Sequence, residues 1–311
     1  QRVVLLGGGI IAALSLAGFV LGAVGAAFFG QEPLLRVPEV HLAPQPVFHI
    51  GSFAITNTLL SAWVTTVIII LIFSLGTRRM NLVPKGLQNL LEAFVEVLYG
   101  FITSVAGENF GRKLFPLLAT IFLFVAVNAW IALLPIYPTV GLKEGGADHV
   151  TTHLLRSAGT DINMPIALAI IAFLFAEFWG FRAHGIGYLR EFIRFGGIFR
   201  GIVRLNPSMF FYGLIDAAIG GLEFLSHLVR LISFTFRLFG NMIAGEIVLM
   251  MTTFLLTFSG MLMIFYGLEL LVGGVQALIF VGLTLVFTVI AVESHDSEEH
   301  EEGAEKTAVT S

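Results

Sequence analysis

Long apolar stretches recur along the whole chain and are separated by shorter polar segments. A helix needs about 20 residues to cross the hydrocarbon core of a bilayer, and strands of a closed barrel would leave much shorter runs. We therefore predict an all-α integral membrane protein with about six crossings. The predicted crossings are residues 3–29, 56–75, 114–134, 163–181, 208–258 and 261–292.

The first apolar stretch has two interpretations. A cleaved signal peptide is one, but its apolar region would be about 7–15 residues, shorter than residues 3–29. We favour an extra N-terminal transmembrane helix at residues 1–30. Residues 31–55 contain four prolines and are typical of an extended connector, followed by the main membrane domain at 56–292.

Residues 86–101 differ from the predicted crossings. Their apolar positions fall on one helical stripe, with Glu92 and Glu96 off it. This periodicity predicts a helix with one polar face, which we expect to lie at the membrane interface.

The last two apolar segments are unusually long. Residues 208–258 lack proline, and a continuous helix of this length would reach about 75 Å, well beyond a core of about 30 Å. The segment either breaks, with Gly220-Gly221 as the candidate point, or lies steeply tilted. Residues 261–292 return after Ser259-Gly260, so we predict a hairpin of two long tilted helices.

Composition supports lipid as the solvent. The chain is 57% hydrophobic and 12% charged, whereas soluble domains have about 25% charged residues. It has no cysteine, which excludes disulfides, thiolate metal sites and cysteine nucleophiles. No basic block suggests nucleic acid, no phosphate-binding loop suggests a nucleotide, and no cofactor is indicated.

The distribution of basic residues predicts an orientation. Ten basic residues lie in the segments that follow the second and fourth spans or precede the third, and three lie in the two opposite loops. This places both termini, with the acidic tail at 293–311, in the cytoplasm. The ten are Arg78, Arg79, Lys85, Arg112, Lys113, Arg182, Arg190, Arg194, Arg200 and Arg204; the three are Arg36, Lys143 and Arg156.

Polar residues recur at near-heptad steps in the long segment 208–258. Seven residues leave a drift of only about 20° around a helix, so these side chains share one narrow stripe. The stripe consists of Asp216, Glu223, His227, Arg230, Arg237 and Asn241.

The returning segment adds Glu269 and Gln276, again seven residues apart. In an antiparallel hairpin, Glu269 falls level with about residue 250 and Gln276 with about residue 243. One polar cluster, which includes Glu246, then lies toward the outside and another (Asp216, Glu223 and His227) toward the inside. We predict two partial aqueous paths.

Arg237 lies between these clusters. A guanidinium keeps its proton at biological pH, and placing it at bilayer depth costs between about 3 and over 10 kcal/mol. Such a charge is expected where a mobile acidic partner needs it, which indicates ion movement. The alternative is a structural pair with Asp216 or Glu223.

Several polar residues also have structural interpretations. Glu177, beside Trp179 near a helix end, is expected to reach the interface, and Arg230 either does the same or has a functional role. His227 is more often a hydrogen-bonded helix contact. Glu246 and Glu269 could be protonated structural donors. The pairs Gly273-Gly274 and Gly220-Gly221 suit close helix packing.

The sequence Arg-Leu-Phe-Gly-Asn-Met at 237–242, followed by Ala-Gly-Glu at 244–246, closely resembles the signature helix of subunit a of F-type ATP synthases. The likeness covers about residues 48–295. Further blocks in the family's order are 84–92, Asn128 with 133–135, 160–163, 185–187, Glu223 and 276–280.

The resemblance implies a proton-translocating stator subunit that makes no ATP itself. Arg237 would face the carboxylates of the rotor c-ring, with Glu223, Ser226 and the nearby His227 on the inner half-channel. The outer half-channel would contain Asn241, Glu246, Glu269 and Gln276, helped by Asp161 and Asn163. Further implied partners are the peripheral-stalk b subunits and lipid, in a bacterial plasma membrane.

Two features depart from the family pattern. Some relatives have histidine where this chain has Glu269, so a relay through imidazole at that point is absent. The helix at 3–29 is also unusual for bacterial members. The transported ion, proton or sodium, stays open.

Two other classes of protein account for the sequence less well. A secondary cation/proton antiporter usually shows paired repeats and interrupted helices, and neither is evident. A structural assembly subunit would leave the ionisable stripe unexplained.

Overall fold

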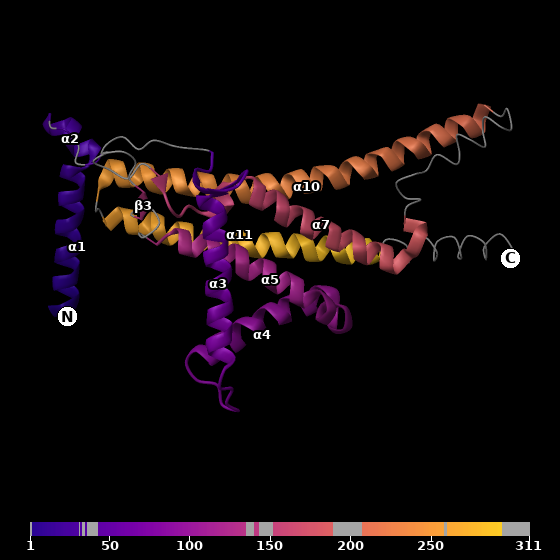
Figure 1. The fold of residues 1–311 in the computed structure, drawn as a ribbon, viewed down its shortest axis with the longest axis horizontal. Coiled ribbons are helices and arrows are strands. Elements are labelled where there is room, and N and C mark those ends of the chain that lie inside the picture. The colour runs from indigo at the N-terminus through magenta and orange to yellow at the C-terminus, as the bar shows by residue number, and fades with distance from the viewer. Residues whose placement is uncertain are drawn as a thin grey trace. The chain divides into compact units, whose positions relative to one another are not determined.

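The computed structural model describes residues 2–30, 32, 35, 43–134, 140–142, 152–188, 207–257 and 260–293 (Figure 1). The predicted acidic tail beyond residue 293 and most of the basic stretch after residue 188 lie outside these ranges. The described helices are α1 (Arg2–Leu21), α2 (Ala23–Phe29), α3 (Asn57–Thr77), α4 (Leu87–Ala106), α5 (Glu108–Ala132), α7 (Asn163–His184), α10 (Pro207–Leu256) and α11 (Gly260–Glu293).

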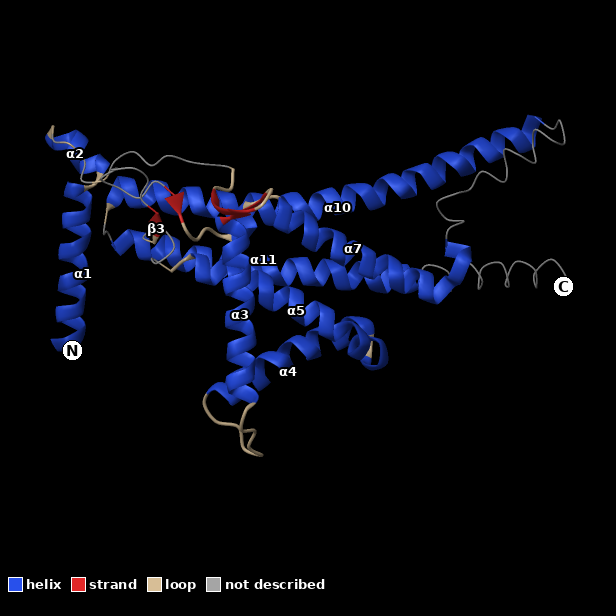
Figure 2. Cartoon of the chain, in the orientation of Figure 1, coloured by secondary structure: helices blue, strands red, loops and turns tan. Residues whose placement is uncertain are grey.

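The remaining regular structure is short. Strands β1 (Pro46–Ile50) and β2 (Phe53–Thr56) form one antiparallel pair, and β3 (Gly141–Leu142) and β4 (Thr152–His153) form another. Two 3₁₀ turns, η1 (Ala158–Thr160) and η2 (Gly185–Tyr188), flank α7. Figure 2 shows that helix dominates the described chain, so the predicted all-α fold class is confirmed.

Among the described residues, six helices are long and apolar enough to cross a membrane: α3, α4, α5, α7, and the greater part of α10 and of α11. The number of these helices equals the predicted number of crossings. The set differs from the predicted one, because it includes α4. We had expected only an interfacial helix at 86–101. The helix continues to Ala106, and the additional turn gives it a spanning length. A crossing by α1 stays a prediction.

The chain divides into two compact units. The first unit comprises residues 1–88, 121–164 and 237–279, and the second comprises 89–120, 165–236 and 280–311. Each unit contains part of α5, α10 and α11. Along α10 the first unit begins at Arg237.

The helix α10 is unbroken over 50 residues (Figure 1). The predicted break at Gly220-Gly221 is therefore absent, which leaves a steep tilt as the way to fit its length into a bilayer. Pro207 occupies the first helical position, where its missing N–H costs no intrahelical hydrogen bond.

Within the first unit, α10 and α11 form the predicted antiparallel hairpin. Asn241 Nδ2 donates to Gln276 Oε1 at 2.6 Å, close to the expected level of residue 243. The carboxylate of Glu269 packs against Gly245, although we had expected it level with about residue 250. The difference arises because α10 already ends at Leu256, so the hairpin turns slightly earlier than predicted.

The same unit shows close packing between α5 and α11. Trp130 Nε1 donates to the carbonyl oxygen of Leu270 at 2.9 Å. A Cβ atom at Gly273 would lie 2.9 Å from Ala129 Cβ, whereas one at Gly274 would meet Trp130 at 3.5 Å. The predicted role of this glycine pair in helix packing is confirmed. The same prediction is wrong for Gly221, where an added Cβ atom would meet no described atom within 4 Å.

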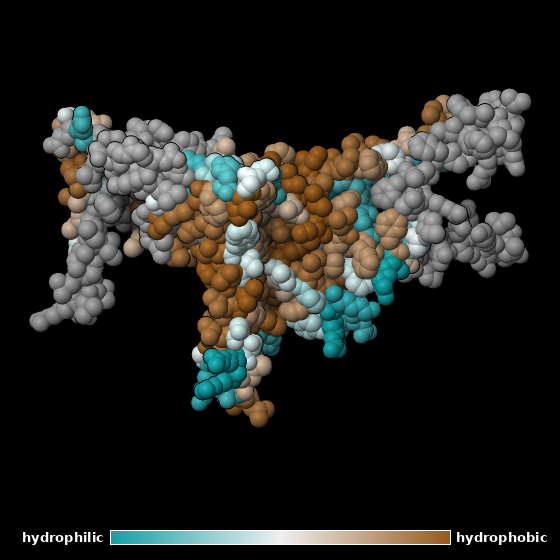
Figure 3. All heavy atoms as spheres, viewed as in Figure 1, coloured by the Kyte–Doolittle hydropathy of each residue, from teal (hydrophilic) through white to brown (hydrophobic). Residues whose placement is uncertain are grey.

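The helix surfaces are strongly apolar. On α3, Ile70, Leu71 and Leu75 are each more than half exposed, and Figure 3 shows hydrophobic residues over much of the visible face. In water such a surface would favour aggregation. In a bilayer it faces the lipid chains.

The contact between Gly273 and Ala129 gives a test of this packing. Gly273→Ala should lower the denaturation midpoint of the purified complex, because overpacking a tight contact costs about 1–3 kcal/mol. Gly274→Ala is the matched control, since its new methyl group would lie at an ordinary van der Waals distance from Trp130. Equal midpoints for the two variants would contradict the described packing.

Candidate functional site

A cavity of about 430 Å³ lies within the first unit. We call it the Glu246 cavity. Its lining includes Glu246 from α10, Tyr266 and Glu269 from α11, and Arg156 and Ser157 from the segment between β4 and η1. Two of the acids predicted for the outer path therefore line one space.

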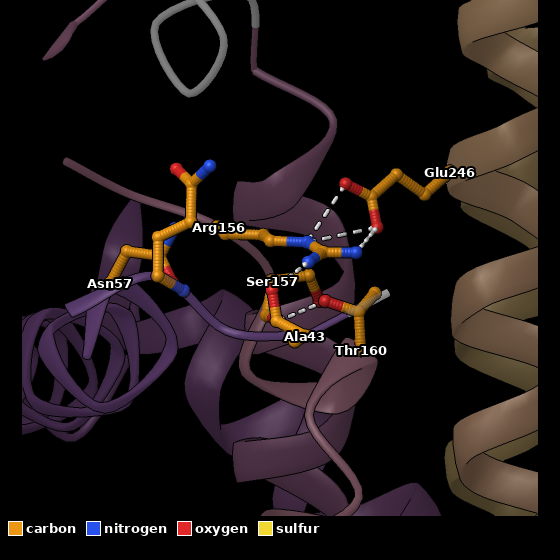
Figure 4. A network of polar contacts seen from close by, with 7 residues as sticks. Ala43, Asn57, Arg156, Ser157, Thr160 and Glu246 are labelled. Carbon is orange, nitrogen blue, oxygen red and sulfur yellow. Dashed lines mark hydrogen bonds and ion pairs between the residues drawn. The ribbon is translucent and has the colours of Figure 1, made fainter. Parts of the chain in front are cut away.

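Glu246 is bound by an arginine that the sequence analysis had counted only as a loop charge. Arg156 Nε donates to Glu246 Oε1 at 3.1 Å and to Oε2 at 3.3 Å, and Nη2 donates to Oε2 at 3.0 Å. Figure 4 shows the guanidinium reaching toward the carboxylate on α10. The side chains are 12% and 29% exposed. Multidentate arginine–carboxylate pairs of this kind fix geometry as well as charge.

The backbone around Arg156 is tied to α3. The N–H of Arg156 donates to Ser61 Oγ at 3.0 Å, and that hydroxyl donates to the carbonyl oxygen of Asn57 at 3.0 Å. Arg156 Nη1 also donates to the carbonyl oxygen of Ala43 at 3.3 Å (Figure 4). These contacts direct the side chain toward α10.

Asp161 and Asn163 lie at the start of α7. Asp161 accepts hydrogen bonds from Thr58 Oγ1 at 2.9 Å and from the backbone N and Nδ2 of Asn163 at 3.1 and 2.9 Å. A carboxylate that accepts the first N–H groups of a helix acts as its cap. The predicted place of both residues in the outer path stays a prediction, since neither lines the Glu246 cavity.

Asn241 and Gln276 form the second polar contact of the hairpin. Gln276 is only 2% exposed, and its Nε2 makes no hydrogen bond with the described residues. Within those residues, Glu269 likewise forms neither a hydrogen bond nor an ion pair. Arg237 lies half-buried on α10, about one helical turn before Asn241.

The second unit contains another ionisable pair. His227 Nδ1 on α10 lies 2.7 Å from Glu177 Oε1 on α7, and the side chains are 12% and 14% exposed. The expectation that Glu177 reaches the interface is therefore wrong. It fails because the face of α7 that includes Phe173 and Glu177 turns toward α10, as the edge-to-face contact between Phe173 and His227 also shows.

The other predicted inner residues lie on the same helix. Glu223 is half-buried, and Ser226 and Asp216 are exposed. Arg230 does not point away from the helices, because its Cζ lies 3.7 Å from the ring centre of Phe287 on α11. This distance is that of a cation–π contact.

Arg156 and Glu177 are the two site residues that the sequence analysis missed. A lone carboxylate within an apolar span was itself a signal for Glu177, because such a group is costly unless paired. For Arg156 no local pattern separates it from an ordinary loop charge. Within the described ranges, no three histidine, aspartate or glutamate side chains gather closely enough to hold a metal ion.

The fold and these polar groups define a polytopic membrane protein with acids, amides and histidine along one continuous helix on both sides of an arginine. Ionisable groups placed in this way within membrane-spanning helices are typical of ion pathways. A model of the family ATP synthase A chain matches residues 59–289, so the chain belongs to this family.

Several curated relatives agree. The chain is 33% identical over 275 residues to ATP synthase subunit a of Gloeobacter violaceus, which covers 87% of this chain and 97% of that protein. It is 32% identical to ATP synthase subunit a of Solidesulfovibrio magneticus, over 78% of this chain and 85% of that protein. ATP synthase subunit a 3 of Pelobacter propionicus is 33% identical over 79% of this chain and 90% of its own length.

The ion pair in the Glu246 cavity gives the second testable prediction. Arg156→Gln should destabilise the complex by about 1–3 kcal/mol. This is less than the roughly 3–5 kcal/mol of a fully buried pair, since Glu246 is 29% exposed. The double variant with Glu246→Gln should lose less, because no carboxylate is left without its partner.

Thermal denaturation of the purified complex measures this order. The midpoint should be highest for the wild type, lower for the double variant and lowest for Arg156→Gln. Additive losses from Arg156→Gln and Glu246→Gln would mean that the two charges do not stabilise each other.

Proposed function

We propose that the chain, as the proton-translocating stator subunit of an ATP synthase, conducts protons through two offset half-channels separated by Arg237. Membership of the family supports the general role. The observation that supports the half-channels is the arrangement along α10, where His227 and Glu223 precede Arg237 and Asn241 and Glu246 follow it on one unbroken helix.

The outer half-channel includes the Glu246 cavity. Arg156 neutralises Glu246, so we assign the exchange of protons with water in the cavity to Glu269, which has no partner among the described residues. Gln276 and Asn241 continue the path along the hairpin toward Arg237. The Nε2 group of Gln276 remains available for water there.

Arg237 acts on the carboxylates of a rotor ring. A positive charge favours the ionised form of a nearby carboxylate, so a ring carboxyl that arrives at Arg237 releases its proton. The guanidinium itself keeps its protons and thereby blocks direct leakage between the half-channels. Each proton that crosses 100 mV supplies about 2.3 kcal/mol, which the ring converts into rotation.

The inner half-channel contains Glu223, Ser226 and His227. The partners in this scheme are the c-ring and the peripheral-stalk b subunits, and the ATP chemistry takes place on other subunits. The excess of basic residues in one set of loops supports cytoplasmic termini in a bacterial plasma membrane. No observation on the described residues favours a cation/proton antiporter.

The role of Arg237 can be tested by substitution. Arg237→Ala should abolish ATP synthesis driven by an acid pulse in reconstituted vesicles, while passive proton permeability stays the same or increases. Arg78→Ala is the matched control, since Arg78 is exposed at the end of α3. Normal coupled synthesis by Arg237→Ala would refute the proposal.

The assignment of Glu269 gives a separate test. Glu269→Gln should lower acid-driven ATP synthesis at least several-fold, because an amide cannot exchange a proton in the cavity. Glu293→Gln, at the exposed end of the same helix, should synthesise ATP at the wild-type rate. If Glu269→Gln matched this control, Glu269 would have no place in the outer path.

A further inference from the structure

The pair formed by Glu177 and His227 is a second set of ionisable groups buried between helices. The Nδ1–Oε1 distance of 2.7 Å is that of a strong hydrogen bond, and each side chain is less than 15% exposed. A single ionisable residue at this depth is costly, and here two of them meet, one from α7 and one from α10. The pair therefore joins the two helices through ionisable groups.

The surroundings of the pair include both aromatic and charged side chains. Phe173 meets the imidazole edge-to-face. Among the described residues, the charged and titratable groups near the pair include Arg230 and Glu223 on α10 and Tyr188 on η2, since Arg230 interacts electrostatically with Glu177, Tyr188 and Glu223. The helix α11 presents Phe287 to Arg230, and on α7 Trp179 packs against Phe110 of α5.

The charge balance of the pair allows it to hold one exchangeable proton. With Glu177 ionised, Nδ1 of a neutral His227 donates to the carboxylate, and the pair has one negative charge. A proton taken up by the pair converts it into an imidazolium–carboxylate pair with no net charge. Neither state leaves an isolated positive charge between the helices.

The position of the pair suits the inner half-channel. His227 lies about one helical turn from Glu223 and about 15 Å before Arg237 along α10. Imidazole is the side chain whose protonation changes most readily near neutral pH. Glu177 forms a hydrogen bond with Nδ1 and thereby fixes the orientation of the imidazole ring.

We propose that Glu177 and His227 together form a proton-binding site of the inner half-channel, with Glu177 as the positioning residue and His227 as the group that takes up the proton. This inference rests on the proposed function. The site receives a proton that has left the ring on the inner side of Arg237 and releases it toward the inner aqueous phase. The net change is the transfer of that single proton.

The experiment measures ATP synthesis by the reconstituted complex at a fixed driving force while the pH of the inner aqueous phase is varied. Glu177→Gln keeps an acceptor for Nδ1 but removes the carboxylate. It should lower the rate several-fold and move the pH profile by about one unit. His227→Gln should lower the rate and remove the inflection due to imidazole, and Glu177→Asp should restore the wild-type profile.

The double variant Glu177→Leu with His227→Leu is the packing control. If the pair serves only to join α7 and α10, this variant and Glu177→Gln will show the wild-type pH profile in assembled complexes, and the inference is overturned. If Glu177→Gln prevents assembly, His227→Gln decides the matter by the same profile.

Arg237→Ala is measured in parallel. Loss of synthesis in Arg237→Ala together with a wild-type profile in Glu177→Gln would reject only the proton-binding pair. Normal synthesis in Arg237→Ala would instead reject the half-channels on which the pair depends.

Discussion

The cost of placing ionisable side chains among lipid-facing helices is the constraint on which this structure depends. A charge that leaves water must be compensated by an opposite charge or by hydrogen bonds. The described chain does this in three ways: Arg156 binds Glu246, Glu177 binds His227, and Asp161 accepts three hydrogen bonds at the start of α7. Glu269, which lines a cavity, has no such partner among the described residues.

The presence or absence of a cationic partner distinguishes the roles that we propose for Glu246 and Glu269. A carboxylate held by a bidentate guanidinium stays ionised and fixed, which suits a wall of a water-filled space. A carboxylate that faces the same space without a cationic partner can exchange a proton with water. Glu246 and Glu269 line one cavity, yet their surroundings assign them different tasks. In the proposed outer path, the segment that presents Arg156 forms part of the cavity wall together with the two long helices.

The sequence predicted the helices and the hairpin well, because hydrophobic length and heptad spacing are local properties. The contact of Asn241 with Gln276 follows from the antiparallel geometry alone. Arg156 and Glu177 could not be placed in this way. Periodicity assigns a residue to one face of its own helix, but the neighbour that this face meets depends on tertiary packing, and Arg156 lies outside any helix. The helix α4 is ambiguous for a related reason, since its polar face favours an interface while its full length suffices for a crossing.

The proposed half-channels require that water reaches the polar groups on the two sides of Arg237 from opposite faces of the membrane. The chain contains no cysteine, so single cysteines can report on this directly. Ser157→Cys, in the Glu246 cavity, and Ser226→Cys, on the exposed face of α10, are conservative replacements. A small, membrane-impermeant thiol reagent applied to sealed vesicles of either orientation should modify Ser157→Cys only from the outer side and Ser226→Cys only from the inner side. Modification of both from the same side would contradict the two half-channels.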